Sequence, residues 1–282
     1  MQDNSITDYL DTNRANWDDR ASAHATRTGL GYQVQRYVDD PTLLSSAVLF
    51  DRDRLGDITG LNTVHLQCHI GTDTLSLARL GARVTGLDFS PIALAEARAL
   101  VAETGDAVDF VESDLYSALT ALPPASFDLV YTGIGALCWL PSIERWAAVV
   151  AGLLVPGGRL FIREGHPILW TMDEGLSDDL HLRFPYFEQQ EPLEWDDDST
   201  YVVTDRPITH TKTYEWNHGL GEIVTALLNA GLTLTMLVEH DSVPWEALPG
   251  QMIERPNGEF ALDALAGVAP LSYTIQAVKP AA

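Results

Sequence analysis

One short segment constrains the fold more than any other part of the chain: HLQCHIGTDTLSLARLGARVTGLDFS, residues 65–90. The stretch NTVHLQC predicts a buried strand, TDTLSLARLG a helix closed by Gly81, and ARVTGLDF a second strand. Ser90 and Pro91 then supply an N-cap and the first turn of another helix. The segment therefore predicts a strand, turn, helix and strand at the opening of an α/β fold.

The alternation of strands and helices continues through the rest of the chain. AVDFVES, FDLVYTG and VPGGRLFIRE predict three more strands, and IERWAAVVAGLL predicts an amphipathic helix. Helix GEIVTALLNAG and strands LTLTMLVEH and PLSYTIQAV follow, the two strands as an antiparallel pair at one edge. We therefore expect a doubly wound, seven-stranded, mostly parallel α/β sheet of Rossmann-like type.

Two segments lie outside this alternation of strands and helices, and each predicts a part of the structure added to the main domain. Residues 1–42 form a polar, helical N-terminal cap, which Pro41 separates from the main domain at residues 43–282. About 50 residues with clustered aromatics separate the fifth strand from the next helix, which is long for a structureless loop. We expect an inserted β-hairpin lid at residues 165–216, over the carboxyl end of the sheet, where such folds bind ligands.

The formal charge of −23 excludes several classes of partner. It repels nucleic-acid phosphates and anionic lipids, and we attribute it to a soluble surface, with a patch for a cationic partner as the alternative.

The chain has no apolar run near 20 residues and no secretory signal, and two cysteines make no disulfide framework. We expect a cytoplasmic protein that acts on a small molecule, without nucleic acid or membrane as partner. Aromatics in the lid and cap favour a homodimer.

An acid at the end of the second strand predicts a nucleoside cofactor. Asp88 lies 17 positions after Gly71, close to the spacing at which a carboxylate meets ribose hydroxyls. That spacing also fits a nicotinamide enzyme. However, a pyrophosphate must approach the middle glycine of such a turn closely, and that position here is His69. S-adenosylmethionine carries no phosphate, so the turn favours this cofactor, with S-adenosylhomocysteine as product.

With these motifs the sequence resembles the class I S-adenosylmethionine-dependent methyltransferases over nearly all of residues 40–280. ESDL after the third strand, FDLVYTGIGALCWL at the fourth and LLVPGGRLFI at the fifth match the family's pattern. The resemblance implies a cofactor-binding set: Gln67, Cys68, His69 and Gly71 along the methionine moiety, Asp88 at the ribose, Phe89 at the adenine ring, Asp114 at the adenine amine, Thr132 and Gly133 under the sulfonium, with Ser90 and Leu115 beside them.

The chain departs from the family in three places. His65 replaces the usual acid, and Gln67 and His69 replace the first two glycines, which leaves the pose around the methionine amino group open. Gly71 is kept, which we attribute to a helix that starts there against the cofactor. His65, Cys68 and His69 superficially suggest a metal site, but a four-residue spacing converges only on a helix. We therefore expect no metal, and we interpret His65 as a hydrogen-bonded strand residue.

The motifs LQCH-x-G-x-DTLS and WNHGLGEIV resemble a bacterial subgroup of this family. Some of its members methylate indole C3 of tryptophan-derived metabolites and give pyrroloindolines. The resemblance thus implies C-methylation of an indole in secondary metabolism. The alternatives are O- or N-methylation of another aromatic or heterocyclic metabolite, a nicotinamide-dependent oxidoreductase, and a binding protein that retains the cofactor fold without turnover.

Catalytic candidates lie where the fifth strand ends. Glu164 and His166 would receive the acceptor's proton, with Tyr32 or Arg20 organising water; a surface salt bridge is the alternative for the pair. We interpret Cys138 as a small buried apolar residue and not as a nucleophile. The substrate-binding candidates come from the cap, the fourth strand and the lid, the lid aromatics alternatively forming its core: Trp17, His24, Trp139, Trp170, Tyr186 and Trp216, with Trp195 and Tyr214 in the same aromatic group.

Overall fold

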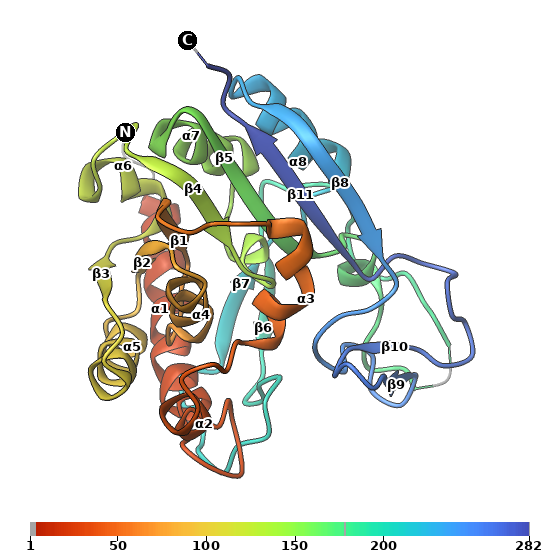
Figure 1. The fold of residues 1–282 in the computed structure, drawn as a ribbon. Coiled ribbons are helices and arrows are strands. Elements are labelled where there is room, and N and C mark those ends of the chain that lie inside the picture. The colour runs from red at the N-terminus through yellow and green to blue at the C-terminus, as the bar shows by residue number, and fades with distance from the viewer. Residues whose placement is uncertain (1–3, 178, 282) are drawn as a thin grey trace.

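The central sheet of the computed structural model, which describes residues 4–177 and 179–281, has seven strands (Figure 1). Their order is β3-β2-β1-β4-β5-β11-β8. β11 is antiparallel to both β5 and β8, whereas the other neighbours are parallel. The predicted fold class is confirmed. The strands are β1 Asn62–Leu66, β2 Arg83–Asp88, β3 Val108–Glu112, β4 Phe127–Thr132, β5 Leu154–Gly165, β8 Thr233–His240 and β11 Ser272–Val278.

Helices cover both faces of the sheet with separate apolar cores. On one face α7 and α8 bury Trp146 and Ile223 against β1, β4 and β5, and on the other α3 and α4 bury Leu55 and Leu77 against β4 and β5. Ser90 caps α5 as predicted, because its Oγ accepts from Ala93 N at 3.0 Å. The helices are α3 Ser46–Leu55, α4 Thr72–Arg79, α5 Pro91–Thr104, α6 Ala118–Ala121, α7 Ile143–Leu153 and α8 Leu220–Asn229, with 3-10 turns η1 Leu115–Ser117 and η2 Leu137–Trp139.

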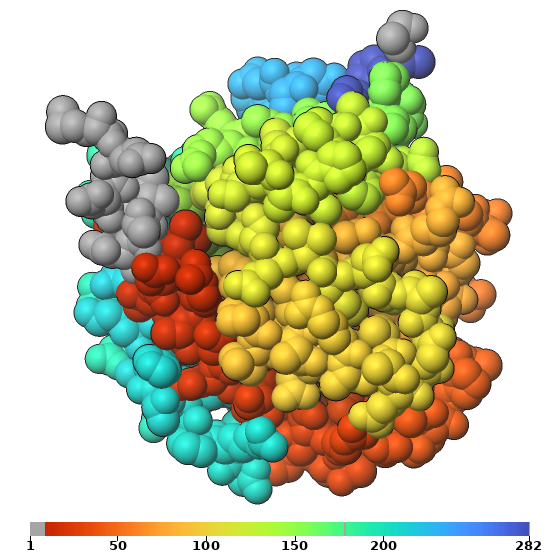
Figure 2. Space-filling view, turned by 90° about the vertical axis from the view of Figure 1, so that its left-hand side faces the viewer, coloured from red at the N-terminus to blue at the C-terminus, as the bar shows by residue number. Residues whose placement is uncertain are grey.

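The N-terminal cap consists of α1 (Asn4–His24) and the short α2 (Gln35–Asp39). α1 lies between α5 and the lid, as Figure 2 shows, where the red segment has the gold helix on one side and the cyan lid on the other. Its polar character does not mean that it is solvated. Asn13 exchanges two hydrogen bonds of 2.8 Å with the backbone of Tyr214, and Asn16 Nδ2 donates to His210 O at 2.6 Å. The cap and the lid are therefore joined by buried amides.

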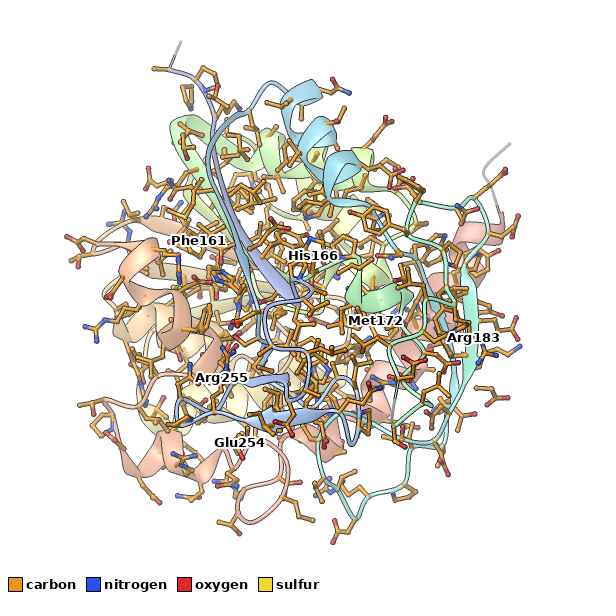
Figure 3. The ribbon with its side chains drawn as sticks, turned by 90° about the vertical axis from the view of Figure 1, so that its right-hand side faces the viewer. Phe161, His166, Met172, Arg183, Glu254 and Arg255 are labelled. Atoms are coloured by element: carbon orange, nitrogen blue, oxygen red, sulfur yellow. The ribbon has the colours of Figure 1, made fainter. Side chains whose placement is uncertain are left out.

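The lid contains the predicted hairpin, formed by β6 (Leu193–Asp196) and β7 (Lys212–Glu215), after the 3-10 turn η3 (Leu169–Thr171). A second hairpin, β9 (Met252–Glu254) with β10 (Phe260–Leu262), lies between β8 and β11 and was not predicted. Met172 at the start of the lid packs in one cluster with Met252 of β9. Figure 3 labels Met172 and, on the hairpin, Glu254 at the end of β9. The lid thus rests on this second hairpin as well as on the sheet.

Candidate cofactor and substrate site

In the turn after β1, two residues that are not glycine adopt the positive φ that usually requires glycine. Gln67 and His69 have φ values of +56° and +51°, in the left-handed region that costs a non-glycine residue about 1–2 kcal/mol. Their side chains find partners outside the turn: Gln67 Nε2 donates to Ala136 O at 2.9 Å, and His69 Nε2 lies 2.8 Å from His24 Nδ1. The His69 side chain therefore leaves the turn towards α1, while the turn keeps the path that glycines favour.

Gly71 is needed for packing at the start of α4. Its φ is +78°, and a Cβ there would lie 2.9 Å from Ala97 Cβ and 3.2 Å from Phe110 Cζ. The close packing of the α4 start on α5 and β3 therefore by itself requires a glycine here, and the expected contact of Gly71 with the cofactor stays a prediction. The Cys68 side chain is also turned away, because its Sγ occupies the space next to Gly86. Only the backbone of Cys68 faces the turn.

Asp88 at the end of β2 is buried and fixes both sides of the turn. Its Oδ2 accepts from His69 N at 2.8 Å, and its Oδ1 accepts from Ser90 N at 2.9 Å. Burial raises the pKa of this carboxyl to about 6. Each oxygen keeps a further lone pair for a ribose hydroxyl. The Ser90 hydroxyl is already bonded to α1, because its Oγ donates to Asp18 Oδ1 at 2.5 Å.

The predicted adenine-side residues lie at the ends of β2 and β3. Phe89 is half-buried beside Asp88. Asp114 caps η1 and accepts from Ser117 N at 3.2 Å, which leaves its second oxygen without a bond from the protein in the part of the chain described. Leu115 is buried in the core of the α7 face. Phe89 and Asp114 are thus placed to meet a nucleoside, and the Leu115 side chain is not.

Two buried oxygens at the carboxyl ends of β1 and β4 have no hydrogen-bond partner among the described residues. They are Gln67 Oε1 and Thr132 Oγ1. An unsatisfied buried polar group costs about 1–3 kcal/mol, so such groups usually mark a ligand or water. Both atoms lie where the amino-acid end and the sulfonium were predicted, and both accept hydrogen bonds. These two acceptor oxygens therefore fit S-adenosylmethionine. At Gly133 the nearest side-chain oxygen, Asp73 Oδ2, lies 3.1 Å from a Cβ position.

Glu164 braces a loop and is not placed as a base. Its Oε1 accepts from the backbone N of Gly135 at 2.5 Å and of Gly165 at 2.7 Å, and its Oε2 accepts from Ala136 and Leu137 at 2.8 and 2.9 Å. Burial raises the pKa of this carboxyl while the four N–H donors oppose the shift. With four donors its lone pairs are in use. The carboxylate therefore holds the loop after β4 in place, which corrects its predicted role.

His166 is likewise engaged by the protein. Its Nδ1 accepts from Ile168 N at 3.1 Å, so Nε2 carries the proton and donates to Glu239 Oε1 at 3.0 Å. Burial lowers the pKa of this imidazole. Its ring lies edge-on to Tyr273 of β11. Because both ring nitrogens have protein partners, the expected carboxylate–histidine pair for proton removal is not present.

The cap brings Arg20, a predicted catalytic residue, together with Trp17 and Trp139, two predicted substrate-binding residues. The Arg20 guanidinium lies 5.4 Å from the Trp17 ring centre and 5.6 Å from that of Trp139. The two indoles meet edge to face at 5.2 Å, and Trp17 also meets His69 at 5.0 Å. Arg20 Nε is buried and has no partner in the described part of the chain. Flat rings and a cation thus line one side of the turn.

His24 and Tyr32 belong to a hydrogen-bonded chain from the turn to the lid. His24 contacts His69 through Nδ1 and Thr200 Oγ1 through Nε2, both at 2.8 Å. Tyr32 and Tyr201 share a hydrogen bond of 2.5 Å between their hydroxyls. Burial lowers the pKa of His24 to about 2 and of His69 to about 3, so both rings are neutral. The chain ties cap, lid and turn into one unit.

Three lid aromatics pack against other parts of the chain. Trp170 stacks on Trp245 at 5.9 Å, and Tyr186 packs on Gly219. Trp216 is 3% exposed and borders, with Trp170, a cavity of about 10 Å³, which has room for one water but not for a ring. Their predicted contact with substrate is therefore corrected to a packing role.

Sequence reasoning missed Glu215, the last residue of β7, beside the loop after β4. Neither a hydrogen bond nor an ion pair connects its carboxylate to another residue that the structure describes. The signal was present in the alternation of the strand: Thr213 and Glu215 share one face, and Thr213 is buried. An inward-facing acid on an edge hairpin is unusual enough to mark a site.

Residues 64–160 match a family model described as a methyltransferase domain. They run from β1 into β5 and include the turn, Asp88 and the loop after β4. Over these residues the chain is similar to methyltransferase domains. The likeness favours S-adenosylmethionine over the nicotinamide alternative.

The relatives of this methyltransferase domain agree with the fold. Over 110 residues the chain is 36% identical to a ubiquinone biosynthesis O-methyltransferase of Cupriavidus pinatubonensis, covering 39% of this chain and 43% of the relative. For the same enzyme of Xanthomonas euvesicatoria the identity is 35% over 106 residues, 38% of this chain and 44% of the relative. The chain thus matches less than half the length of these curated relatives.

Solved structures match over more of the chain at low sequence identity. An S-adenosylmethionine-dependent methyltransferase from Mesorhizobium loti has a TM-score of 0.55 at 22% identity, covering 86% of this chain and 99% of its own. One from Clostridium acetobutylicum has a TM-score of 0.53 at 14% identity, with 84% and 91% covered. These likenesses support the fold around the methyltransferase domain.

Within the described residues, no helix is long and apolar enough to cross a membrane.

Proposed function

We propose that this chain transfers a methyl group from S-adenosylmethionine to a small aromatic molecule. The observation that carries the proposal is the set of unpartnered acceptors, Gln67 Oε1 and Thr132 Oγ1, beside the Asp88 carboxylate. When bound, the cofactor supplies an electrophilic methyl group on a sulfonium.

The protein's own contribution is chiefly to position and enclose the reactants. Methyl transfer needs a nucleophile held in line about 3 Å from the methyl carbon more than it needs elaborate acid–base groups. Glu164 fixes the loop after β4 through three backbone bonds, so it would hold that side of the site rigid. α1 and the lid, joined by Asn13 and Asn16, would exclude water from the other side.

The proposed acceptor is the indole of a tryptophan-derived metabolite, methylated at C3 with pyrroloindoline formation. Trp17, Trp139 and the Arg20 guanidinium offer the faces on which a flat, electron-rich ring stacks. A phenol would stack equally well. The names of the curated relatives favour O-methylation, which is therefore the second candidate.

A product assay separates these candidates. The protein is incubated with methyl-labelled S-adenosylmethionine and, separately, a tryptophan cyclodipeptide, an N-acyl tryptamine and a catechol. A labelled pyrroloindoline from either indole supports the proposal, whereas a labelled methyl ether from the catechol alone supports O-methylation. Binding of S-adenosylhomocysteine without turnover of any acceptor would indicate a protein that retains the cofactor fold only.

A further inference from the structure

We infer that Glu215 is the residue that accepts the proton of the aromatic acceptor, an inference that rests on the proposed function. Glu164 and His166 have no lone pair left for this task, because each is used by backbone or side-chain donors. Glu215, in the lid, differs from both because its carboxylate accepts no hydrogen bond from the described residues, although the charge of Arg20 acts on it.

The register of the lid hairpin points Glu215 inward. Leu193 lies opposite Glu215, and Trp195 lies opposite Thr213, so these four side chains share one face of the two strands. Thr213 is buried, whereas Glu194 and Lys212 on the other face are exposed and pair with each other. The inward face is therefore the one that carries Glu215.

This face meets the loop after β4, at the end of the sheet where the methyl group would lie. Directly after Glu215, the N–H of Trp216 donates to Cys138 O at 2.8 Å. The next residue of that loop, Trp139, packs against Arg20 and Trp17. Glu215 is thus held beside the aromatic surface proposed for the acceptor.

Two buried polar atoms in this region have no hydrogen-bond partner among the residues described: Trp195 Nε1 on β6 and Arg20 Nε on α1. The half-buried carboxylate of Glu215 on β7 likewise accepts no hydrogen bond from those residues. Buried polar groups are normally paired, so these unpaired groups, around flat rings, indicate a ligand with polar edges. An acceptor with a ring N–H or O–H would satisfy the carboxylate.

The surroundings of Glu215 suit proton transfer near neutral pH. Burial raises the pKa of its carboxyl to about 7, with Arg20 of α1 lowering it and Glu174 in the lid raising it. The Cys138 thiol faces it from η2, and its own pKa is raised by burial, so it stays protonated. A base works best when its pKa lies near the operating pH.

The step balances without another reactant. As the acceptor's ring carbon or oxygen attacks the methyl carbon, the carbon–sulfur bond breaks and its electron pair stays on sulfur. The N–H or O–H proton of the acceptor passes to the Glu215 carboxylate. The products are the methylated acceptor, neutral S-adenosylhomocysteine and protonated Glu215, which then releases the proton to water.

The test uses indole as a probe, added to the full-length protein saturated with S-adenosylhomocysteine, and needs no turnover. Indole binding, followed by NMR, should strengthen as pH rises from 6 to 8 in the wild-type protein. In Glu215→Gln the affinity at pH 8 should fall at least about fivefold and the pH dependence should vanish. Glu194→Gln, on the outer face of the same hairpin, should behave as wild type.

The outcomes separate this inference from the proposed function. Equal affinity for S-adenosylhomocysteine in Glu215→Gln and wild type, with matching melting temperatures, shows that the cofactor site and fold are intact. If Glu215→Gln then binds indole with wild-type affinity and pH dependence, or if wild type shows no pH dependence, the role of Glu215 is overturned. Failure of wild type to bind S-adenosylhomocysteine would instead overturn the proposed function. Where an acceptor is turned over, kcat at pH 8 should fall about 10²-fold or more in Glu215→Gln.

Discussion

Replacing Glu164 with Gln tests whether this residue is a brace or a base. The carboxylate accepts four backbone N–H groups, two on each oxygen. The glutamine amide keeps one acceptor oxygen and presents an NH2 group to the other two donors, which lose their partner. A hydrogen bond to a charged group contributes about 1.5–3 kcal/mol, so the loss should be about 3–6 kcal/mol of the free energy of unfolding.

That loss should be plain in a thermal melt. At roughly 2–4 °C per kcal/mol for a domain of 150–250 residues, the midpoint should fall by about 10 °C. The loop after β4 should also loosen, so the affinity for S-adenosylhomocysteine should fall together with stability. Glu239→Gln is the matched control, because Glu239 is a carboxylate on the same sheet, with its side chain 52% exposed, and should cost under about 1 kcal/mol.

The opposite pattern would refute this reasoning. A catalytic base would give a Glu164→Gln protein with an unchanged melting midpoint, unchanged affinity for S-adenosylhomocysteine and reduced turnover. That result would return Glu164 to the role expected from its position at the end of β5.

Three further perturbations follow from the geometry. Asp88→Ala should weaken S-adenosylhomocysteine binding by about 1.5–3 kcal/mol in calorimetry, and an unchanged affinity would remove the ribose assignment. Glu259→Gln leaves the fully buried Arg163 without its bidentate partner, so urea denaturation should show a loss of about 3–5 kcal/mol; a loss below 1 would show that the pair is not needed. Because burial lowers the pKa values of His24 and His69 to about 2 and 3, below the unfolded value of 6.5, their contribution to stability is present above pH 6.5 and is lost as pH falls below it. His24→Gln should therefore reduce the fall in melting temperature between pH 6.5 and 4, and an unchanged slope would contradict this.

The main elements could be predicted from sequence because their signals are local. Apolar runs, the N-cap at Ser90 and the helix stop at Gly81 depend on neighbours within a few positions. The second hairpin escaped prediction because β9 and β10 have three residues each, too few for an alternation to be recognised. Polar residues such as Asn13 and Asn16 are typical of a solvated helix. Nothing in the neighbouring sequence shows that the backbone of the lid covers them.

The chemistry of single side chains was harder to predict. Strand position places Glu164 correctly at the end of β5, but it does not show that four backbone N–H groups converge on it. Tryptophans such as Trp170 and Trp216 occur both in binding pockets and in packed cores. Only tertiary contacts distinguish the two roles, and here they show a packed core. The boundary at residue 42, the cytoplasmic location and the homodimer remain predictions.

The most direct test of the account is calorimetric titration of the wild-type protein with S-adenosylhomocysteine and, separately, with NADH. The turn with His69 at its second glycine position and the unpartnered acceptors at Gln67 and Thr132 predict one S-adenosylhomocysteine bound per chain and no heat from NADH. Binding of NADH without binding of S-adenosylhomocysteine would contradict it.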